Sequence, residues 1–227
     1  DFNSALAAVN IGYNNRDIND AAIKQIKVGT NFSLPYPTEI ELSKNIIKCV
    51  PSAEMVRFGK NGADATSAAI RLSRFITQKN HVLICGYHGW HDWYVSSTDR
   101  SLGIPNEIRK LSHSFEYNNF ETVYSLFKKF KDNVACVIME PMNLEYPKDN
   151  FLEKIKEICR KNKSLLIFDE VITGFRFAKG GAQQELGVVP DLTALGKGMA
   201  NGFPISALVG KRKYMKNFDK VFFSGTH

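Results

Sequence analysis

The chain has 227 residues, 44% of them hydrophobic, and a formal net charge of +7 at pH 7. A chain of this size can bury a sizeable core, either as one large domain or as one domain with part of another. No apolar run approaches the ~20 residues of a membrane span. The four cysteines lack a CxxC pair, which favours reduced thiols in a cytoplasmic protein over a disulfide scaffold: Cys49, Cys85, Cys136 and Cys159.

The positive charge suits a nucleic acid or another anionic ligand, so a non-enzymatic binding protein is one function class to weigh. The basic residues are dispersed, and their densest runs lie at 128–131, 160–163 and 211–216. No zinc-finger or RNP pattern accompanies them. Solvated helix faces explain the charge better, and we expect neither a nucleic-acid nor a membrane partner.

Helical and strand patterns alternate along the chain. In chain order we predict helices at 17–28 and 38–49, a strand at 55–58, a helix at 64–77, a strand at 81–85, a helix at 120–131, a strand at 135–139, a helix at 151–162, and strands at 165–168 and 205–210. The strands are short and continuously apolar. This pattern predicts an α/β protein with a mostly parallel, buried sheet.

The segment GKNGADA follows the first predicted strand and opens a helix. Free N–H groups at a helix start bind phosphate, and small residues such as Gly62 and Ala63 let the anion approach. The alternative is an ordinary strand–helix turn capped by Asn61 or Asp64. Neither a P-loop nor a GxGxxG motif occurs in the chain.

Asp169 and Glu170 follow the apolar run 165–168. A carboxylate there is unfavourable unless a cationic or protonated group meets it. Such an acid can hold a protonated heterocyclic nitrogen or a metal; the alternative is a pair of strand-end acids bridged to Arg176. The histidines offer no strong zinc spacing, so we expect no metal site.

Lys197 lies between two glycines in the segment TALGKGMANGFP. A lysine on such a loop can form an imine with an aldehyde, because small neighbours leave room for a flat ring. The alternative is a loop lysine in water. Aromatic residues crowd the segment GYHGWH, where Tyr87 and Trp90 either stack on a flat ligand or pack in the core.

In this order, these segments resemble the class III pyridoxal-phosphate aminotransferases of fold type I. FGKNGADATSAAIRLSR and YHGWHDW are most similar to the glutamate-1-semialdehyde aminomutase branch, and IGYNNRDINDAAIKQI resembles that family's N-terminal segment. The resemblance implies a mostly parallel central sheet with helices on both faces. It also implies an N-terminal segment at 1–45, a large cofactor-binding domain at 46–227, and a small C-terminal domain beyond this sequence.

The resemblance further implies residue roles around pyridoxal 5′-phosphate. Lys197 would hold the cofactor aldehyde as a Schiff base, and Asp169 would pair with the pyridine nitrogen. These two are the expected catalytic residues. Val171 would pack on one face of the ring, and Tyr87 would stack on the other. Glu140 would lie near the ring oxygen.

The phosphate would bind the N–H groups of Gly62 and Ala63, with Asn61 alongside. Thr226 would reach the phosphate of the neighbouring subunit, which implies a homodimer with shared active sites. The partners would be a small-molecule amino donor and a carbonyl acceptor.

Two segments differ from the family pattern where substrate would be recognised. Ala5-Leu6-Ala7 stands in place of a Ser-aromatic-Gly run, and Glu145 and Tyr146 follow the Glu-Pro pair. The sequence therefore leaves two alternatives open: an enzyme like glutamate-1-semialdehyde aminomutase, or an aminotransferase for a keto-sugar or an ω-amino compound.

Overall fold

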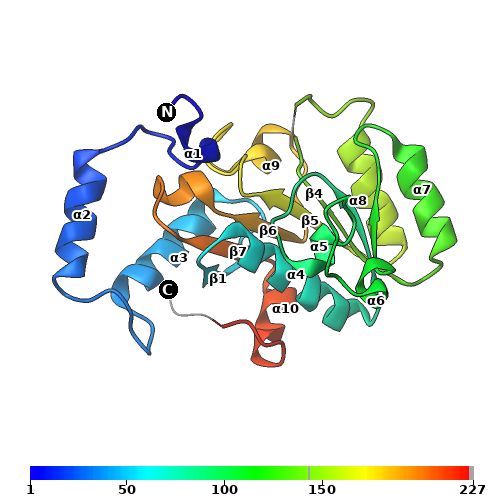
Figure 1. Ribbon diagram of the computed structural model, residues 1–227, viewed down its shortest axis with the longest axis horizontal. Helices are drawn as coiled ribbons and strands as arrows, with labels where there is room; N and C mark the ends of the chain where they lie inside the picture. The colour runs from blue at the N-terminus through cyan, green and yellow to red at the C-terminus, as the bar shows by residue number, and fades with distance from the viewer. Residues whose placement is uncertain (143, 225–227) are drawn as a thin grey trace.

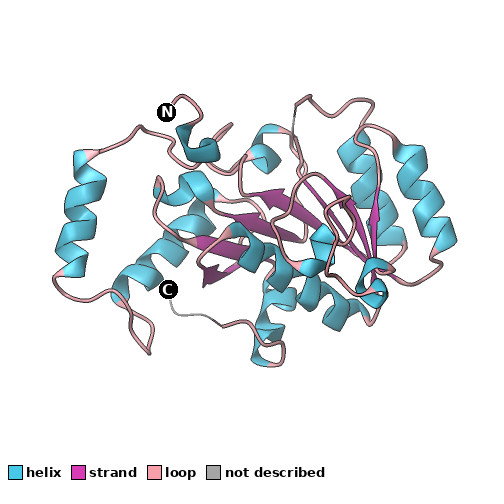
Figure 2. Ribbon diagram, in the orientation of Figure 1, coloured by secondary structure: helices cyan, strands magenta, loops and turns pink. Residues whose placement is uncertain are grey.

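The computed structural model describes residues 1–142 and 144–224. A seven-stranded sheet lies at the centre of this part of the chain (Figures 1 and 2). Its order is β1-β7-β6-β5-β4-β2-β3. The strands are β1 (Met55–Gly59), β2 (His81–Cys85), β3 (Ser112–Ser114), β4 (Val134–Met139), β5 (Leu165–Glu170), β6 (Leu192–Leu195) and β7 (Ser206–Gly210). Only β7 runs antiparallel to its neighbours, β1 and β6. The other pairings are parallel, which confirms the predicted α/β class.

The five longer described helices match the predicted ones within a few residues. They are α2 (Arg16–Ile26), α3 (Pro37–Cys49), α4 (Gly62–Thr77), α7 (Phe120–Lys129) and α8 (Phe151–Lys161). Short helical turns lie between them: α1 (Ser4–Ala7), α5 (Asp92–Val95), α6 (Asn106–Arg109), α9 (Ala182–Glu185) and α10 (Arg212–Met215). Two 3-10 turns complete the set, at Lys197–Ala200 and Lys216–Asp219.

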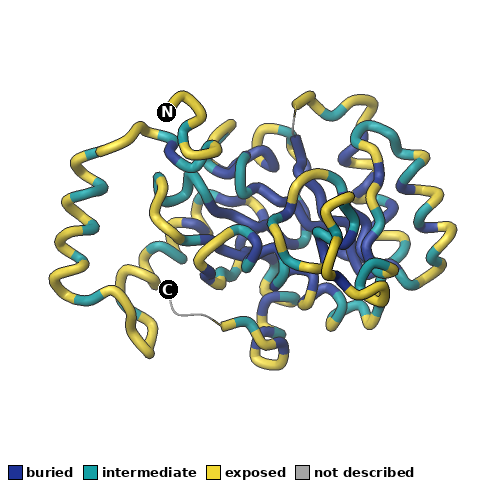
Figure 3. Tube along the Cα trace, viewed as in Figure 1, coloured by how far each residue is buried: buried dark blue, intermediate teal, exposed yellow. Residues whose placement is uncertain are grey.

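Helices cover both faces of the sheet, and buried residues fill the space between the layers (Figure 3). In β5, Leu165 and Ile167 belong to the core cluster that contains α4. Leu166 and Phe168 belong to the cluster that contains α7 and α8. Alternate side chains of a strand point to opposite faces, so a sheet buried on both sides gives a continuously apolar strand.

The sequence patterns missed two strands. β3 has the polar sequence SHS and pairs only with β2 at the sheet edge, so no apolar run marks it. β6 has the sequence LTAL, four fully buried residues, which is too short to stand out before the glycine-rich turn. In addition, β5 extends to Glu170, so Asp169 and Glu170 belong to the strand itself.

The N-terminal part reaches out from the sheet. Helix α2 lies at one end of the long axis of the molecule and has no fully buried residue (Figure 1). Helix α3 packs on the sheet through Ile46, in the same core cluster as Phe58 and Val209. α3 also spans the position of the predicted boundary after residue 45, and that division into domains stays a prediction. None of the described helices has the length and apolar character needed to cross a bilayer.

Candidate active site

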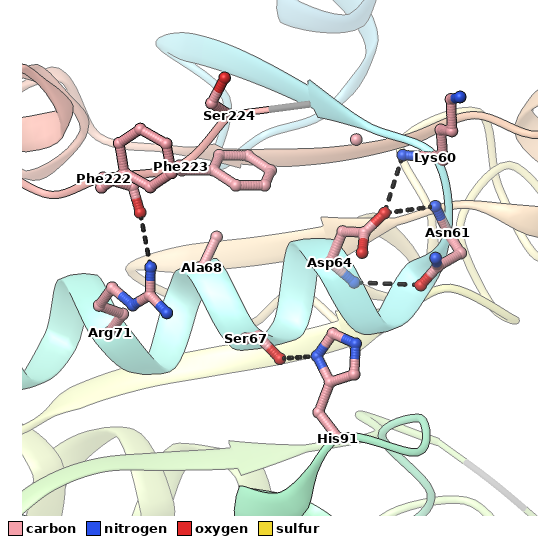
Figure 4. Close-up of a pocket in the computed structure, with 11 residues that line it drawn as sticks. Lys60, Asn61, Asp64, Ser67, Ala68, Arg71, His91, Phe222, Phe223 and Ser224 are labelled. Carbon is pink, nitrogen blue, oxygen red and sulfur yellow. Dashed lines mark hydrogen bonds between the residues drawn. The ribbon is translucent and has the colours of Figure 1, made fainter. Parts of the chain in front are cut away.

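The turn between β1 and α4 is fixed by a reciprocal pair of side chains. Asn61 Oδ1 accepts a hydrogen bond from Asp64 N at 3.2 Å. Asp64 Oδ2 accepts from the backbone N–H groups of Asn61 and Lys60, both at 2.9 Å (Figure 4). This capping box starts the helix as the sequence predicted. The N–H groups of Gly62 and Ala63 lie in the first turn, where a helix has no acceptor of its own for them.

The loop after β2 is pressed against this helix start. Gly89 has φ +100°, and a Cβ placed on it would lie 2.6 Å from the Cβ of Ala63. Thr66 Oγ1 donates to the carbonyl of His88 at 3.0 Å. Gly86 is equally constrained, with φ +108° and Glu140 Oε2 at 2.4 Å from its ideal Cβ position. These contacts therefore hold the loop between the two glycines across the start of α4.

The loop separates its aromatic residues into two environments. Tyr87 and Trp90 are 61% and 72% exposed, so core packing does not account for them. His88 is 2% exposed and points inward. Tyr87 N donates to Glu140 Oε2 at 3.2 Å, which ties the loop to the residue after β4.

Asp169 is held by buried partners. Its Oδ2 lies 2.7 Å from His88 Nδ1, and its Oδ1 accepts from Val171 N at 3.0 Å. The other ring nitrogen of His88 lies 3.2 Å from the carbonyl oxygen of Cys85. The predicted alternative, a bridge from the strand-end acids to Arg176, is wrong, because Arg176 donates to Ala7 O and Ile172 O instead.

Glu170 occupies the opposite face of the sheet and has a different environment. Gln183 and Thr173 donate side-chain hydrogen bonds to its carboxylate, at 2.9 Å each, and the N–H groups of Ala182 and Gln183 also donate. Burial raises the pKa of Glu170, and these donors oppose the shift. The carboxylate therefore organises the segment 180–183 and takes no part in the cavity described below.

Lys197 lies in a strained turn after β6. Its φ is +44°, a left-handed value that costs a non-glycine residue about 1–3 kcal/mol. Burial lowers the pKa of its amine from the usual 10.5, and the carboxylates of Asp169 and Glu140 oppose that shift. Backbone strain and a lowered pKa together are typical of a functional lysine rather than of a loop lysine in water.

These residues line one cavity of about 480 Å³, within the ~300–1,000 Å³ typical of small-molecule sites. The structure brings together every predicted site residue that it describes: Asn61, Gly62, Ala63, Tyr87, Glu140, Asp169, Val171 and Lys197. Gly62 is required, because a Cβ there would lie 2.9 Å from Val171 Cγ2. Thr226 lies outside the described residues.

Sequence reasoning missed several residues of the cavity. One is His88, because its contact with Asp169 depends on which strands are neighbours in the sheet. Phe203 and Pro204 line the cavity as well, and so does Trp90, for which the sequence had left stacking on a ligand and core packing open. The segment NGFP, residues 201–204, was the available signal for Phe203 and Pro204. Within 1–142 and 144–224, no group of three His, Cys, Asp or Glu residues has the arrangement of a metal site.

The chain belongs to the class-III aminotransferase family, whose sequence profile matches residues 1–227. The glutamate-1-semialdehyde 2,1-aminomutase of Methanosphaera stadtmanae is 40% identical over 95% of this chain and 55% of the relative. The 3-aminobutyryl-CoA aminotransferase of Cloacimonas acidaminovorans is 41% identical over 100% of this chain and 56% of the relative.

A solved structure agrees with the fold. The FumI protein of Sphingopyxis sp. MTA144, in its PLP internal aldimine form, is 30% identical and superimposes with a TM-score of 0.92. The alignment covers 99% of this chain and 56% of that one. The chain thus spans little more than half the length of the proteins it matches.

Proposed function

We propose that the protein is a pyridoxal-phosphate-dependent enzyme that transfers an amino group. The observation that carries the proposal is the shared cavity of Lys197 and Asp169, in which a lysine with a lowered pKa and a buried carboxylate line the same space. Family membership and the cofactor-bound FumI structure support the same conclusion.

The donor set of the cavity fits this cofactor. The first-turn N–H groups of Gly62 and Ala63 suit its phosphate, helped by the positive end of the α4 dipole. Asp169 suits its ring nitrogen, and Lys197 Nζ would attach to its aldehyde carbon. Val171 and the exposed ring of Tyr87 would cover its two faces, with Glu140 near the ring oxygen. Bound there, pyridoxal phosphate supplies an electron sink for the bond that breaks at the substrate Cα.

The residues of the chain have separable tasks in this scheme. His88 and Val171 N fix both carboxylate oxygens of Asp169, so the acid keeps one orientation. Its charge would keep the ring nitrogen of the bound cofactor protonated. Lys197 Nζ would take the proton from the substrate Cα and deliver it to the cofactor carbon that carried the aldehyde. Its lowered pKa favours the neutral amine that a general base requires.

We propose that the substrate belongs to one of two chemical classes. One is the semialdehyde chemistry named for the Methanosphaera relative, and the other is an ω-amino compound or a keto-sugar. The Cloacimonas relative, a 3-aminobutyryl-CoA aminotransferase, supports transfer between two molecules but names neither of these substrates. A panel of glutamate, 4,5-diaminovalerate, ω-amino acids and amino-sugars separates them. The active donor is the one that converts bound pyridoxal phosphate to its amine form.

We also propose a cytoplasmic homodimer in which Thr226 of one subunit reaches the cofactor phosphate of the other. Four free cysteines support a reducing compartment. Exposed apolar side chains on the N-terminal part, including Ile23, Ile26 and Leu34, support association with another surface.

The test of the central proposal is a visible absorption band in the purified whole protein supplied with pyridoxal phosphate. We expect the band in the wild type and in Lys154→Ala, which removes an exposed lysine of α8, and its loss in Lys197→Ala. A colourless wild type that cannot be reconstituted would overturn the proposal. Salt-sensitive binding of nucleic acid that survives Lys197→Ala would favour the alternative binding protein.

A further inference from the structure

Residues 7–12 of the N-terminal segment lie against the turn that contains Lys197. Arg176 joins the segment to the loop after β5: its Nη2 donates to Ala7 O at 2.6 Å and to Asn10 Oδ1 at 2.5 Å. Its Nε donates to Ile172 O at 3.0 Å. One guanidinium therefore binds two parts of the chain that are more than 160 positions apart.

Asn10 makes the direct contact with the lysine turn. A Cβ placed on Gly198 would lie 2.1 Å from Asn10 Nδ2 and 2.5 Å from Asn10 Cγ. The side-chain amide thus covers the backbone of the residue that follows Lys197. A side chain at 198 would therefore displace the Asn10 amide, whereas the backbone itself would accept one, because Gly198 is not among the residues with positive φ.

Asn201, at the C-terminal end of the turn, binds the same N-terminal segment. Its Oδ1 accepts from Ile11 N at 3.0 Å, and its Nδ2 donates to Gly12 O at 3.1 Å. Val9 is buried next to these groups, 3.4 Å from the ideal Cβ position of Gly202.

The lysine turn has few local contacts that fix its shape: Met199 N donates to Gly196 O at 3.0 Å, and Phe203 N donates to Ala200 O at 3.1 Å. Gly196, Gly198 and Gly202 have no side chains, while Lys197 itself holds a left-handed φ of +44°. A strained residue keeps its conformation only when its surroundings fix it. Asn10, Ile11 and Gly12 contact the turn from outside it, and Ile18 and Ala22 of α2 line a cavity beside it.

We propose that Arg176, Asn10 and Asn201 form a clamp that holds residues 7–12 on the turn and thereby positions Lys197 for the cofactor. These three are positioning residues. The inference rests on the proposed function, because it takes Lys197 as the cofactor lysine. The positive charge of Arg176 also contributes to the lowered pKa of Lys197.

The first experiment breaks the clamp at Arg176 in the whole protein. Arg176→Lys keeps the charge but loses the pair of nitrogens, Nε and Nη2, that joins Ile172 O to residues 7–12. We expect about tenfold weaker binding of pyridoxal phosphate and about tenfold faster amide hydrogen exchange in residues 8–12. Arg160→Lys is the matched control, because Arg160 makes a comparable paired contact with Glu157 on the exposed face of α8. It should change neither quantity.

The second experiment is a size exchange at the Asn10–Gly198 contact. Gly198→Ala should weaken the visible absorption band of the bound cofactor and lower its affinity about tenfold. Adding Asn10→Ala removes the atoms that the new methyl group meets. We therefore expect the double variant to match Asn10→Ala alone, a rescue that a general loss of stability would not give.

The outcomes separate this inference from the function on which it rests. If Arg176→Lys resembles the wild type in affinity and exchange while Lys197→Ala abolishes the band, the clamp is refuted and the function stands. Losses that multiply in the Gly198→Ala and Asn10→Ala pair also refute it. A wild type that takes up no pyridoxal phosphate would overturn the function and the positioning role together.

Discussion

Neighbouring acids on β5 have different tasks because alternate residues of a strand face opposite sides of the sheet. Asp169 faces the cavity, where His88 and Val171 N hold it. Glu170 faces the other side, where its carboxylate accepts four hydrogen bonds and no cation is paired with it among the described ion pairs. One acid is therefore available for chemistry and the other is structural.

Amide substitution at each acid should separate these tasks. Asp169→Asn should lower kcat for amino transfer about a hundredfold or more and change stability little, since the amide cannot hold the charge on the ring nitrogen. Glu170→Gln should lower the free energy of unfolding by about 1–3 kcal/mol, because its NH₂ group would face donors. Steady-state kinetics and urea unfolding measure the two effects. The reverse pattern would contradict the assignment.

The lowered pKa of Lys197 predicts how the reactivity of its amine changes with pH. Because burial favours the neutral amine, the proton leaves at a lower pH than the usual lysine value of 10.5. In cofactor-free protein, the rate of labelling at Lys197 by an amine-directed reagent should therefore reach half its maximum below that pH. Peptide mass spectrometry follows the site. A half-maximum at or above 10.5 would show that the nearby carboxylates outweigh burial.

Among the elements, the loop after β2 matters most for the shape of the cavity. It leaves Tyr87 exposed and buries His88. It also crosses the start of α4, where the phosphate is proposed to bind. Its close fit comes from two glycines with positive φ, Gly86 and Gly89.

Alanine at Gly89 should push this loop away from α4. The substitution combines an unfavourable φ of +100° with a Cβ 2.6 Å from Ala63, whereas Gly103 has φ +84° and open space around it. We expect Gly103→Ala to cost about 1 kcal/mol from the backbone alone, and Gly89→Ala to cost about 1–3 kcal/mol more and to weaken cofactor binding. Thermal unfolding and cofactor titration measure the pair. Equal effects would mean that the contact with Ala63 is unimportant.

The sequence predicted elements well where burial on both faces made strands continuously apolar, as in β2, β4 and β5. It failed where a strand is polar and at an edge, as in β3, or very short, as in β6. For the site, Asp169 was predictable because it comes at the end of a continuously apolar run, the turn at Gly62 because it follows a predicted strand, and Lys197 because glycines flank it. His88 and Arg176 were not, because their partners, Asp169 and Asn10, come from distant segments that only the fold brings together.

At the scale of the whole molecule, a shared active site makes a specific prediction for mixed dimers. Lys197→Ala and Thr226→Ala remove groups that, in our proposal, come from different subunits of one site. A hybrid of the two variants would contain one intact site and one doubly altered site. Mixing and refolding the two should therefore restore activity above the sum of the separate variants. No gain, with hybrid dimers demonstrated by mass, would contradict shared sites.

The central claim is that Lys197 carries the cofactor, and chemical trapping tests it most directly. Pyridoxal phosphate bound to the whole protein is reduced with borohydride, and the peptides are sequenced by mass spectrometry. We expect a single modified lysine at position 197, absent when Lys197 is replaced and unaffected in Lys154→Ala. Stable modification at a different lysine, or none in a protein that binds the cofactor, would contradict it.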